Sequence, residues 1–216
     1  RKSAQVVLPL LVAIISGLAA AGQWQLGATF LNHTYTGTKD AEFGLDIAFY
    51  LFDLPFYNFA VGFLSTLMLL ALLLAAAAHY MFGNIRFTGR SATVAKAARI
   101  QVSVIAALFL AMQGAALWLD QYATMTSDSG LYTGATYADV NAAIPSFQIL
   151  SLIAFVVAIL FLITAVIGRF RIALIGTGLM VVSSIILAGV FPWVVQTFQV
   201  VPNERTLEAE FIKRNI

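Results

Sequence analysis

The sequence predicts an all-α polytopic membrane protein, a helix bundle with five transmembrane helices and amphipathic interfacial helices in its outer loops. Of the 216 residues, 61% are hydrophobic and 10% are charged, whereas soluble domains average about 25% charged residues. Five apolar segments are also long enough to cross a bilayer, which takes roughly 20 helical residues. The segments lack strand alternation, and a helix satisfies its own backbone in lipid.

The predicted spans make one transmembrane domain over residues 1–193. Residues 194–216 are expected to be extended at first and then charged, as the start of an extracytoplasmic segment. The basic, apolar opening resembles a signal peptide, but the charge pattern described next requires a retained first span. An opening on Arg1 suggests a fragment or a processed protein. The five spans cover residues 6–22, 59–78, 100–119, 149–167 and 172–193.

Charge segregates between the two sets of connections. Eight of the twelve Lys and Arg residues fall on one predicted side, and all ten Asp and Glu residues fall on the other. Basic residues near span ends mark the cytoplasmic side. The start of the chain is therefore predicted to be cytoplasmic and its end extracytoplasmic, with the lipid bilayer as a partner.

Two stretches of the first outer loop have helical amphipathicity. In residues 43–56, Ile47, Tyr50 and Leu54 fall on one side of a helix, while Asp46 and Asp53 fall on another. This pattern predicts a helix on the membrane surface. Pro55 suits the first turn of the following span, where a missing N–H costs little. Residues 24–31 are a second candidate.

The candidate outer-face interaction residues are Asp46, Asp53 and Asp139. They would bind a cation or a partner, although a solvated helix face explains such carboxylates more often, since no EF-hand spacing is present. Asp139 would cap a short helix, and Pro145 would begin the fourth span.

The candidate inner-face lipid contacts are Arg86, Arg90, Lys96 and Arg99. Attraction to anionic lipid explains such a basic patch close to span ends. Nucleic acid is not expected as a partner.

The polar residues of the spans suit helix packing. Interhelical hydrogen bonds are predicted for Gln101, Gln113, Ser183 and Ser184, and an interfacial position for His79. No charged residue falls at mid-depth, which argues against ion-coupled transport. The chain has no Cys and no catalytic or nucleotide-binding motif, so no catalytic residue, cofactor or metal site is predicted, and no enzyme.

Several segments together resemble Uncharacterised Protein Family 0182, large bacterial membrane proteins. They are FGLDIAFYLFDLPF at 43–56, HYMFGNIRF at 79–87, WLDQY at 118–122, YTGATYADVNAAIP at 132–145, FPWVVQTFQVVPNE at 191–204 and EAEFIKRNI at 208–216. The resemblance implies a bacterial plasma-membrane protein several times longer, with further spans ahead of Arg1 and a large extracytoplasmic domain after Ile216. It implies no established activity.

Three functions are compatible with these features. The leading one is a membrane scaffold or anchor that holds an extracytoplasmic domain and partner proteins at the cell envelope. The alternative is a transporter or channel component for lipid or envelope precursors. A third is an enzyme for lipid-linked substrates, which would require Asp46, Asp53, Asp120 and Asp139 to converge in one cleft.

Overall fold

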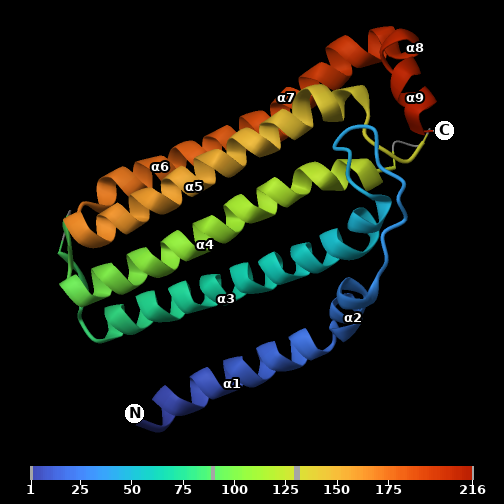
Figure 1. The fold of residues 1–216 in the computed structure, drawn as a ribbon. Helices are drawn as coiled ribbons and strands as arrows, with labels where there is room; N and C mark the ends of the chain where they lie inside the picture. Colours follow the sequence, from blue (N-terminus) through green and yellow to red (C-terminus); the bar gives the residue numbers. More distant parts are fainter. Residues whose placement is uncertain (1, 89–90, 129–131, 216) are drawn as a thin grey trace. The chain divides into compact units, whose positions relative to one another are not determined.

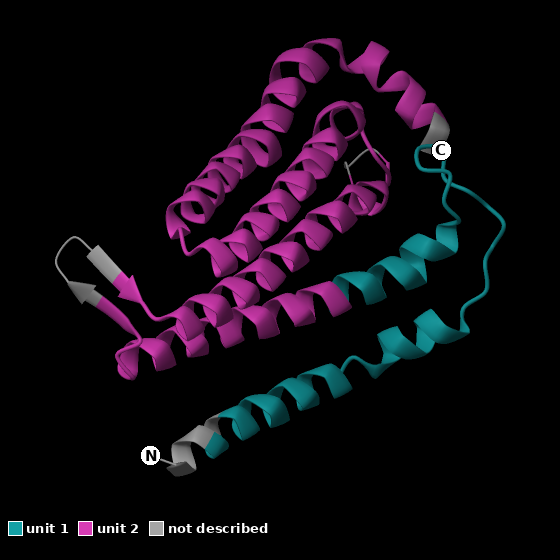
Figure 2. Ribbon diagram, turned by 60° about the vertical axis from the view of Figure 1, so that its left-hand side comes forward, with its two compact units in different colours: residues 1–59 teal, residues 60–216 magenta. Residues whose placement is uncertain are grey.

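A computed structural model of the chain describes residues 2–88, 91–128 and 132–215. The chain divides into two compact units, residues 1–59 and residues 60–216, shown in teal and magenta in Figure 2. Helix α3 (Leu54–Met81) begins in the first unit and continues into the second.

Unit 1 contains two helices joined by a sharp bend and a long capped loop. Helix α1 (Lys2–Ala21) is followed by α2 (Trp24–Asn32). The axes of Pro9–Ala21 and Trp24–Asn32 differ by 49°. The helix predicted over residues 24–31 is therefore present. After the loop, the π-helical turn η1 (Phe49–Asp53) leads into α3.

Unit 2 is built from long helices that run back and forth (Figure 1). After α3 come the hairpin β1–β2 and the long helix α4, with η2 at its end. Helix α5 follows η3, and a short turn leads into α6 and a series of shorter helical segments. Their bounds are β1 (Ile85–Thr88), β2 (Ser91–Val94), α4 (Lys96–Ala123), η2 (Thr124–Thr126), η3 (Asp139–Ala143), α5 (Ile144–Ile167), α6 (Phe170–Ser184), η4 (Ile185–Val190), α7 (Phe191–Val194), η5 (Val195–Val200), η6 (Val201–Asn203), α8 (Glu204–Leu207) and α9 (Ala209–Asn215).

The predicted helical membrane fold is confirmed, with four to five candidate spans among the described residues. Four continuous helices are long and apolar enough to cross a membrane, and the bent pair α1–α2 adds a fifth if it counts as one span. The four are longer than predicted. They cover Phe49–Met81, Lys96–Thr126, Asp139–Ile167 and Phe170–Leu207.

Four of the five prolines each follow a π-helical turn by two residues. Pro55 follows η1, Pro145 follows η3, Pro192 follows η4 and Pro202 follows η5. A proline inside an α-helix lacks an N–H donor, and its ring clashes with the carbonyl four residues back. Here the residue before each proline donates to the carbonyl five residues back, as Leu54 does to Phe49. The wider turn lets the helix continue through the proline.

Two expectations from the prolines and the tail are therefore wrong. Pro55 and Pro145 do not begin helices, because helical structure already starts at Ile47 and at Tyr137. Residues 195–200 are not extended but form η5, in continuation of α6 and α7. A wider turn ahead of a proline leaves no pattern of residue types that could have predicted it.

The connection between α3 and α4 contains a feature that the sequence analysis missed. Strands β1 and β2 pair antiparallel, with Ile85 opposite Val94 and Thr88 opposite Ser91. The two strands lie at the same end of unit 2 as the turn between α5 and α6 (Figure 1).

Small residues allow α4 and α5 to approach closely. Ser103, Ala154 and Leu150 are fully buried. The hydroxyl of Ser151 donates to the carbonyl of Gly114 over 2.7 Å. A Cβ atom at Gly114 would lie only 3.1 Å from the ring of Phe155. Larger apolar side chains complete the interface, namely Leu110, Val157 and Phe161 beside Ala106, Ala107 and Ala158, and Ala173 of α6 joins the same buried cluster.

Polar side chains join the helices in pairs. The Ser65 hydroxyl donates to Gln113 over 2.8 Å, and Gln148 donates to Gln121 over 2.8 Å. His79 lies 3.0 Å from the side-chain oxygen of Gln101. The interhelical hydrogen bonds predicted for Gln101 and Gln113 are thus confirmed.

In α6, the polar side chain of Ser184 bonds within its own helix rather than to a neighbouring one. The Ser184 hydroxyl donates to the carbonyl of Met180 in its own helix over 2.9 Å. The prediction of an interhelical bond is wrong for Ser184, because a serine hydroxyl in a helix can donate its hydrogen bond to the carbonyl four residues earlier in the same helix.

We expect Gly114→Val to destabilise the protein by about 1–3 kcal/mol, because the added atoms overpack the contact with Phe155. Gly178→Val is the matched control, since a Cβ atom at Gly178 meets nothing within 4 Å. Thermal unfolding in detergent would compare the two variants. Equal losses of stability would contradict this account of the α4–α5 interface.

Candidate functional site

The loop before α3 is organised first by the carboxylate of Asp40. It accepts hydrogen bonds from the backbone N–H groups of Glu42, Phe43 and Leu45 over 2.8, 2.6 and 2.7 Å. The hydroxyl of Tyr50 donates to the same carboxylate over 3.0 Å. One side chain thus satisfies three loop amides and ties the loop to the start of the helix.

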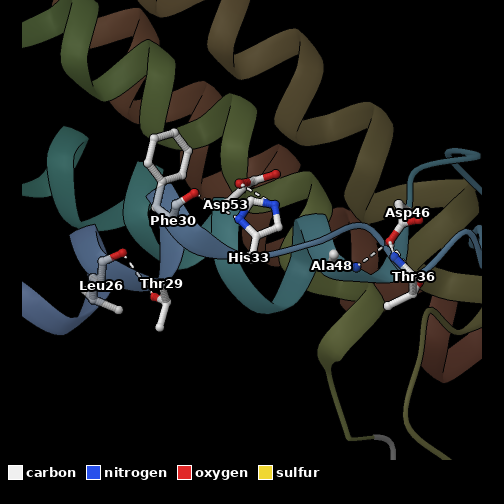
Figure 3. Close-up of polar contacts among 8 residues, drawn as sticks. All are labelled: Leu26, Thr29, Phe30, His33, Thr36, Asp46, Ala48 and Asp53. Carbon is white, nitrogen blue, oxygen red and sulfur yellow. Dashed lines mark hydrogen bonds and ion pairs between the residues drawn. The ribbon is translucent and has the colours of Figure 1, made fainter.

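Asp46 closes the loop and caps the helix that begins at Ile47. Its carboxylate accepts from the N–H of Ala48 over 2.8 Å, the contact of an N-cap residue. It also accepts from the N–H and hydroxyl of Thr36, over 3.1 and 2.9 Å, and from the N–H of Gly37 over 2.6 Å. Figure 3 shows the contacts with Thr36 and Ala48.

These contacts change the acidity of Asp46. Desolvation acts to raise the pKa, but the hydrogen bonds from Ala48, Thr36 and Gly37 outweigh it and lower the pKa from 3.8 to about 2. The solvated interfacial helix predicted over residues 43–56 is therefore wrong at its start. Asp46 precedes the helix and serves the loop.

Asp53 also departs from the predicted solvated face. It is 5% exposed, and its carboxylate oxygen lies 3.5 Å from Nε2 of His33. The other ring nitrogen of His33, Nδ1, lies 2.9 Å from the carbonyl of Phe30 (Figure 3). The ring stacks on Phe52 with a centroid distance of 5.3 Å, and the edge of Tyr35 meets it at 5.2 Å.

The two neighbours of the imidazole determine where protons must lie. A carbonyl can only accept, so the short contact with Phe30 requires a proton on Nδ1 of His33. A neutral ring would then direct the lone pair of Nε2 at the carboxylate of Asp53. At 3.5 Å from Asp53, Nε2 makes no hydrogen bond, and the contact is an ion pair only when the imidazole is protonated.

A pocket of about 490 Å³ opens beside this pair. Its walls are Ala28, Thr29, Asn32, His33, Thr34 and Phe52. The Asn32 side chain donates to the carbonyl of Ala28 over 2.8 Å, which leaves its oxygen as an acceptor. His33 is the one titratable side chain among the described residues that line the pocket. The chemistry suits a largely apolar group that carries a hydroxyl or amide donor.

In unit 2, Asp139 has the capping role that was predicted for it. Its carboxylate accepts from the N–H and hydroxyl of Thr136, both over 2.9 Å, and the Thr136 oxygen accepts from the N–H of Asp139 over 3.2 Å. This is a reciprocal capping box at the start of the helix, with Asp139 as its third residue rather than its N-cap.

Glu208 is a buried carboxylate that the sequence analysis missed. It is 5% exposed and accepts from the hydroxyl of Tyr132 over 2.7 Å and from the N–H of Tyr137 over 3.1 Å. Burial first, and then Glu208, raise the pKa of Tyr132. The acidic tail is thereby fastened to the start of the helix that leads into α5, where negative charge is favourable.

Arg86 lies in β1, and Lys96 and Arg99 lie at the start of α4, so these three basic residues belong to the hairpin end of unit 2 (Figure 1). Nε of Arg86 donates to the carbonyl of Gly83 over 2.9 Å, and Lys96 is exposed at the start of α4. The guanidinium of Arg99 lies against Gly168, in the turn between α5 and α6. Arg90 lies outside the described residues.

The structure does not join the predicted acids into one site. Asp46, Asp53 and Asp139 each have separate partners. In the part of the chain that the structure describes, no three His, Cys, Asp or Glu side chains are grouped to hold a metal ion. The contact of His33 with Asp53 could not be predicted from the sequence, because the two residues are twenty positions apart and Asp53 lies in an apolar stretch.

Comparison with known proteins identifies the family. The model of the "Uncharacterised protein family (UPF0182)" matches residues 1–216. The chain belongs to the UPF0182 family. It is 45% identical over 218 residues to the UPF0182 protein CMS1887 of Clavibacter sepedonicus and 46% identical over 216 residues to a UPF0182 protein of Paenarthrobacter aurescens. Both comparisons cover 100% of this chain.

The UPF0182 relatives are much longer than this chain. It spans 22% of the length of each of these two proteins. A UPF0182 protein of Micrococcus luteus is 40% identical over 97% of the chain, which spans 20% of that relative. No solved structure matches the chain.

We expect the loop of this UPF0182 chain to loosen in acid through Asp46. Because its folded-state pKa is below 3.8, Asp46 stabilises the loop above that pH, and this contribution is lost as the pH falls from 3.8 through about 2. Asp46→Asn keeps an N-cap acceptor for Ala48 but loses the charge that holds Thr36 and Gly37. Amide exchange should therefore quicken mainly at Thr36 and Gly37. In Asp46→Ala it should also quicken at Ala48; uniform exchange in both variants would refute the N-cap role.

We expect His33 and Asp53 to be energetically coupled. Asp53→Leu alone should destabilise unit 1 by about 3 kcal/mol, because it leaves a buried imidazole without its partner. Adding His33→Phe should recover most of that loss, since a phenyl ring can stack on Phe52 in the same place. Thermal unfolding of both single variants and the double variant gives the coupling. Additive losses would show that the 3.5 Å contact contributes nothing.

Proposed function

We propose that this chain is part of an integral membrane scaffold that anchors an extracytoplasmic domain and partner proteins at the bacterial cell envelope. The main observation in support is that polar side chains of neighbouring helices hydrogen-bond to one another. Ser65 pairs with Gln113, Gln101 with His79, and Gln121 with Gln148. Each of these groups hydrogen-bonds to a side chain of a neighbouring helix, which supports a role in helix packing.

The ends of unit 2 support the proposed orientation. Arg86, Lys96 and Arg99 lie at the end with the hairpin. Asp139 and Glu208 lie at the other end, where the tail is fastened. By the positive-inside rule we place the hairpin end at the cytoplasm and the end of the chain outside. The membrane is then the bacterial plasma membrane, with the start of the chain cytoplasmic.

The outward face of the last long helix supports a role in assembly. None of the most apolar window of Phe170–Leu207 is buried, and large side chains such as Leu179, Val182 and Ile185 are more than half exposed. In a bilayer such a face contacts lipid or the helices of other proteins. A scaffold uses surfaces of this kind for partners.

The alternative is a component that transports lipid or envelope precursors. The pocket beside His33 favours it, because apolar walls and a few polar groups suit an amphipathic molecule. The scaffold is preferred, because the carboxylates of the loops are engaged with their own backbones. For the same reason the proposal gives the chain no catalytic role.

We expect the double variant Ser65→Ala/Gln113→Leu to retain scaffold function. Replacing both partners of a hydrogen bond by apolar groups should change stability by about 1 kcal/mol or less. The complete protein would be solubilised gently from its native membrane, and co-purifying proteins would be quantified for the wild type and the variant. The same partners should be recovered in equal amounts.

Two results would contradict the scaffold. A wild-type protein that is recovered as a monomer without co-purifying protein would exclude stable partners. A variant that keeps its partners but loses precursor movement across reconstituted vesicles would favour the transport alternative. Gly178→Val serves as the control for a membrane substitution outside any polar pair.

A further inference from the structure

We infer that the turn between α5 and α6, together with Arg99 of α4, binds the phosphate headgroup of an anionic phospholipid. The first observation is the placement of the Arg99 side chain. Gly168 has φ +88° and no side chain, and a Cβ atom there would lie 2.9 Å from the guanidinium carbon of Arg99. The guanidinium is thus seated on the backbone of the turn rather than extended into water.

The second observation is that no hydrogen bond or ion pair joins this guanidinium to any other described residue. Nε of Arg99 is buried and makes no hydrogen bond. The ion pair found among the described residues joins His33 to Asp53, and none involves Arg99. A guanidinium carries five N–H donors in a planar fork, and a phosphate accepts two of them side by side. Burying such a donor is costly unless an acceptor completes the site.

The surrounding charge is positive without compensation. Arg169 and Arg171 are exposed within the turn and the first residues of α6, and Lys96 is exposed one helical turn before Arg99. No described acidic side chain lies within ion-pair distance of any of these four. Three further cations beside a partly buried guanidinium create a field that attracts an anion.

The flanking residues distinguish a lipid from a free anion. Val166 and Ile167 end α5 with 81% and 61% of their surfaces exposed, and Ile172, in the first turn of α6, is 55% exposed. Each lies within a few residues of the turn, on helices that are long and apolar enough to cross a membrane. A phosphate at the turn therefore has apolar surface directly beside it, where acyl chains would lie.

The binding of a lipid phosphate at this turn does not depend on the scaffold proposal. Only the leaflet in which the lipid lies follows from the orientation proposed there. If the hairpin end faces the cytoplasm, the lipid belongs to the inner leaflet. This site is more specific than general attraction to a basic surface, because it consists of Arg99 held against the turn at Gly168. It also separates Arg99 from Arg86, whose Nε already donates to the carbonyl of Gly83.

The test measures binding of short-chain phosphatidylglycerol to the complete protein in detergent, followed by thermal unfolding. Phosphatidylcholine and inorganic phosphate are the comparison ligands. We expect phosphatidylglycerol to raise the unfolding temperature and Arg99→Gln to weaken its apparent affinity about tenfold, through loss of a bidentate charged contact. Arg86→Gln, with the same loss of charge at the same end of unit 2, should change the affinity less than about twofold.

Arg99→Lys keeps the charge without the fork, so an intermediate affinity is expected, and it reports on the site if Arg99→Gln fails to fold. The inference is overturned if phosphatidylcholine acts equally, if Arg99→Gln and Arg86→Gln weaken binding alike, or if inorganic phosphate alone reproduces the shift. Co-purifying proteins counted in the same preparations separate the two proposals. Lost partners with retained lipid binding would reject the scaffold, and the reverse would reject the lipid site.

Discussion

The constraint on which this structure depends is that a chain in hydrocarbon must satisfy its backbone hydrogen bonds internally. Proline breaks that pattern, yet four prolines lie within the long helices. At Pro55 and at Pro192 a π-helical turn precedes the ring, and the residue before the proline reaches a carbonyl five positions back. The helices therefore pass through their prolines and become longer than the bilayer alone requires.

The same constraint explains the use of the acidic residues. Where a long helix begins, its first N–H groups have no partner within the helix. Asp46 supplies one for the helix that starts at Ile47, and Glu208 and the hydroxyl of Thr136 supply others for the helix that starts at Tyr137. The carboxylates of Asp46 and Asp139 thus accept hydrogen bonds from backbone N–H groups, whereas among the described residues the buried Nε of Arg99, beside Gly168, makes no hydrogen bond.

Much of the fold could be predicted, because apolar length and charge segregation are local properties of a chain. The candidate site could be predicted only in part. Asp139 could be recognised as a cap from its own neighbours, whereas the contact of His33 with Asp53 depends on how a loop returns across α2. The role of Glu208 likewise depends on a tail that folds back over 71 positions to Tyr137.

The sequence by itself determined that the chain is helical and membrane-spanning and that it belongs with the UPF0182 proteins. Composition and motif order suffice for these conclusions, since each helix must be apolar over its own length. Only the tertiary structure decided that Asp53 is buried, that the prolines lie inside helices, and that Arg99 is seated on Gly168. Each of those depends on the distance between residues remote in sequence or on a change in helical hydrogen bonding, and neither leaves a periodic signal in the sequence.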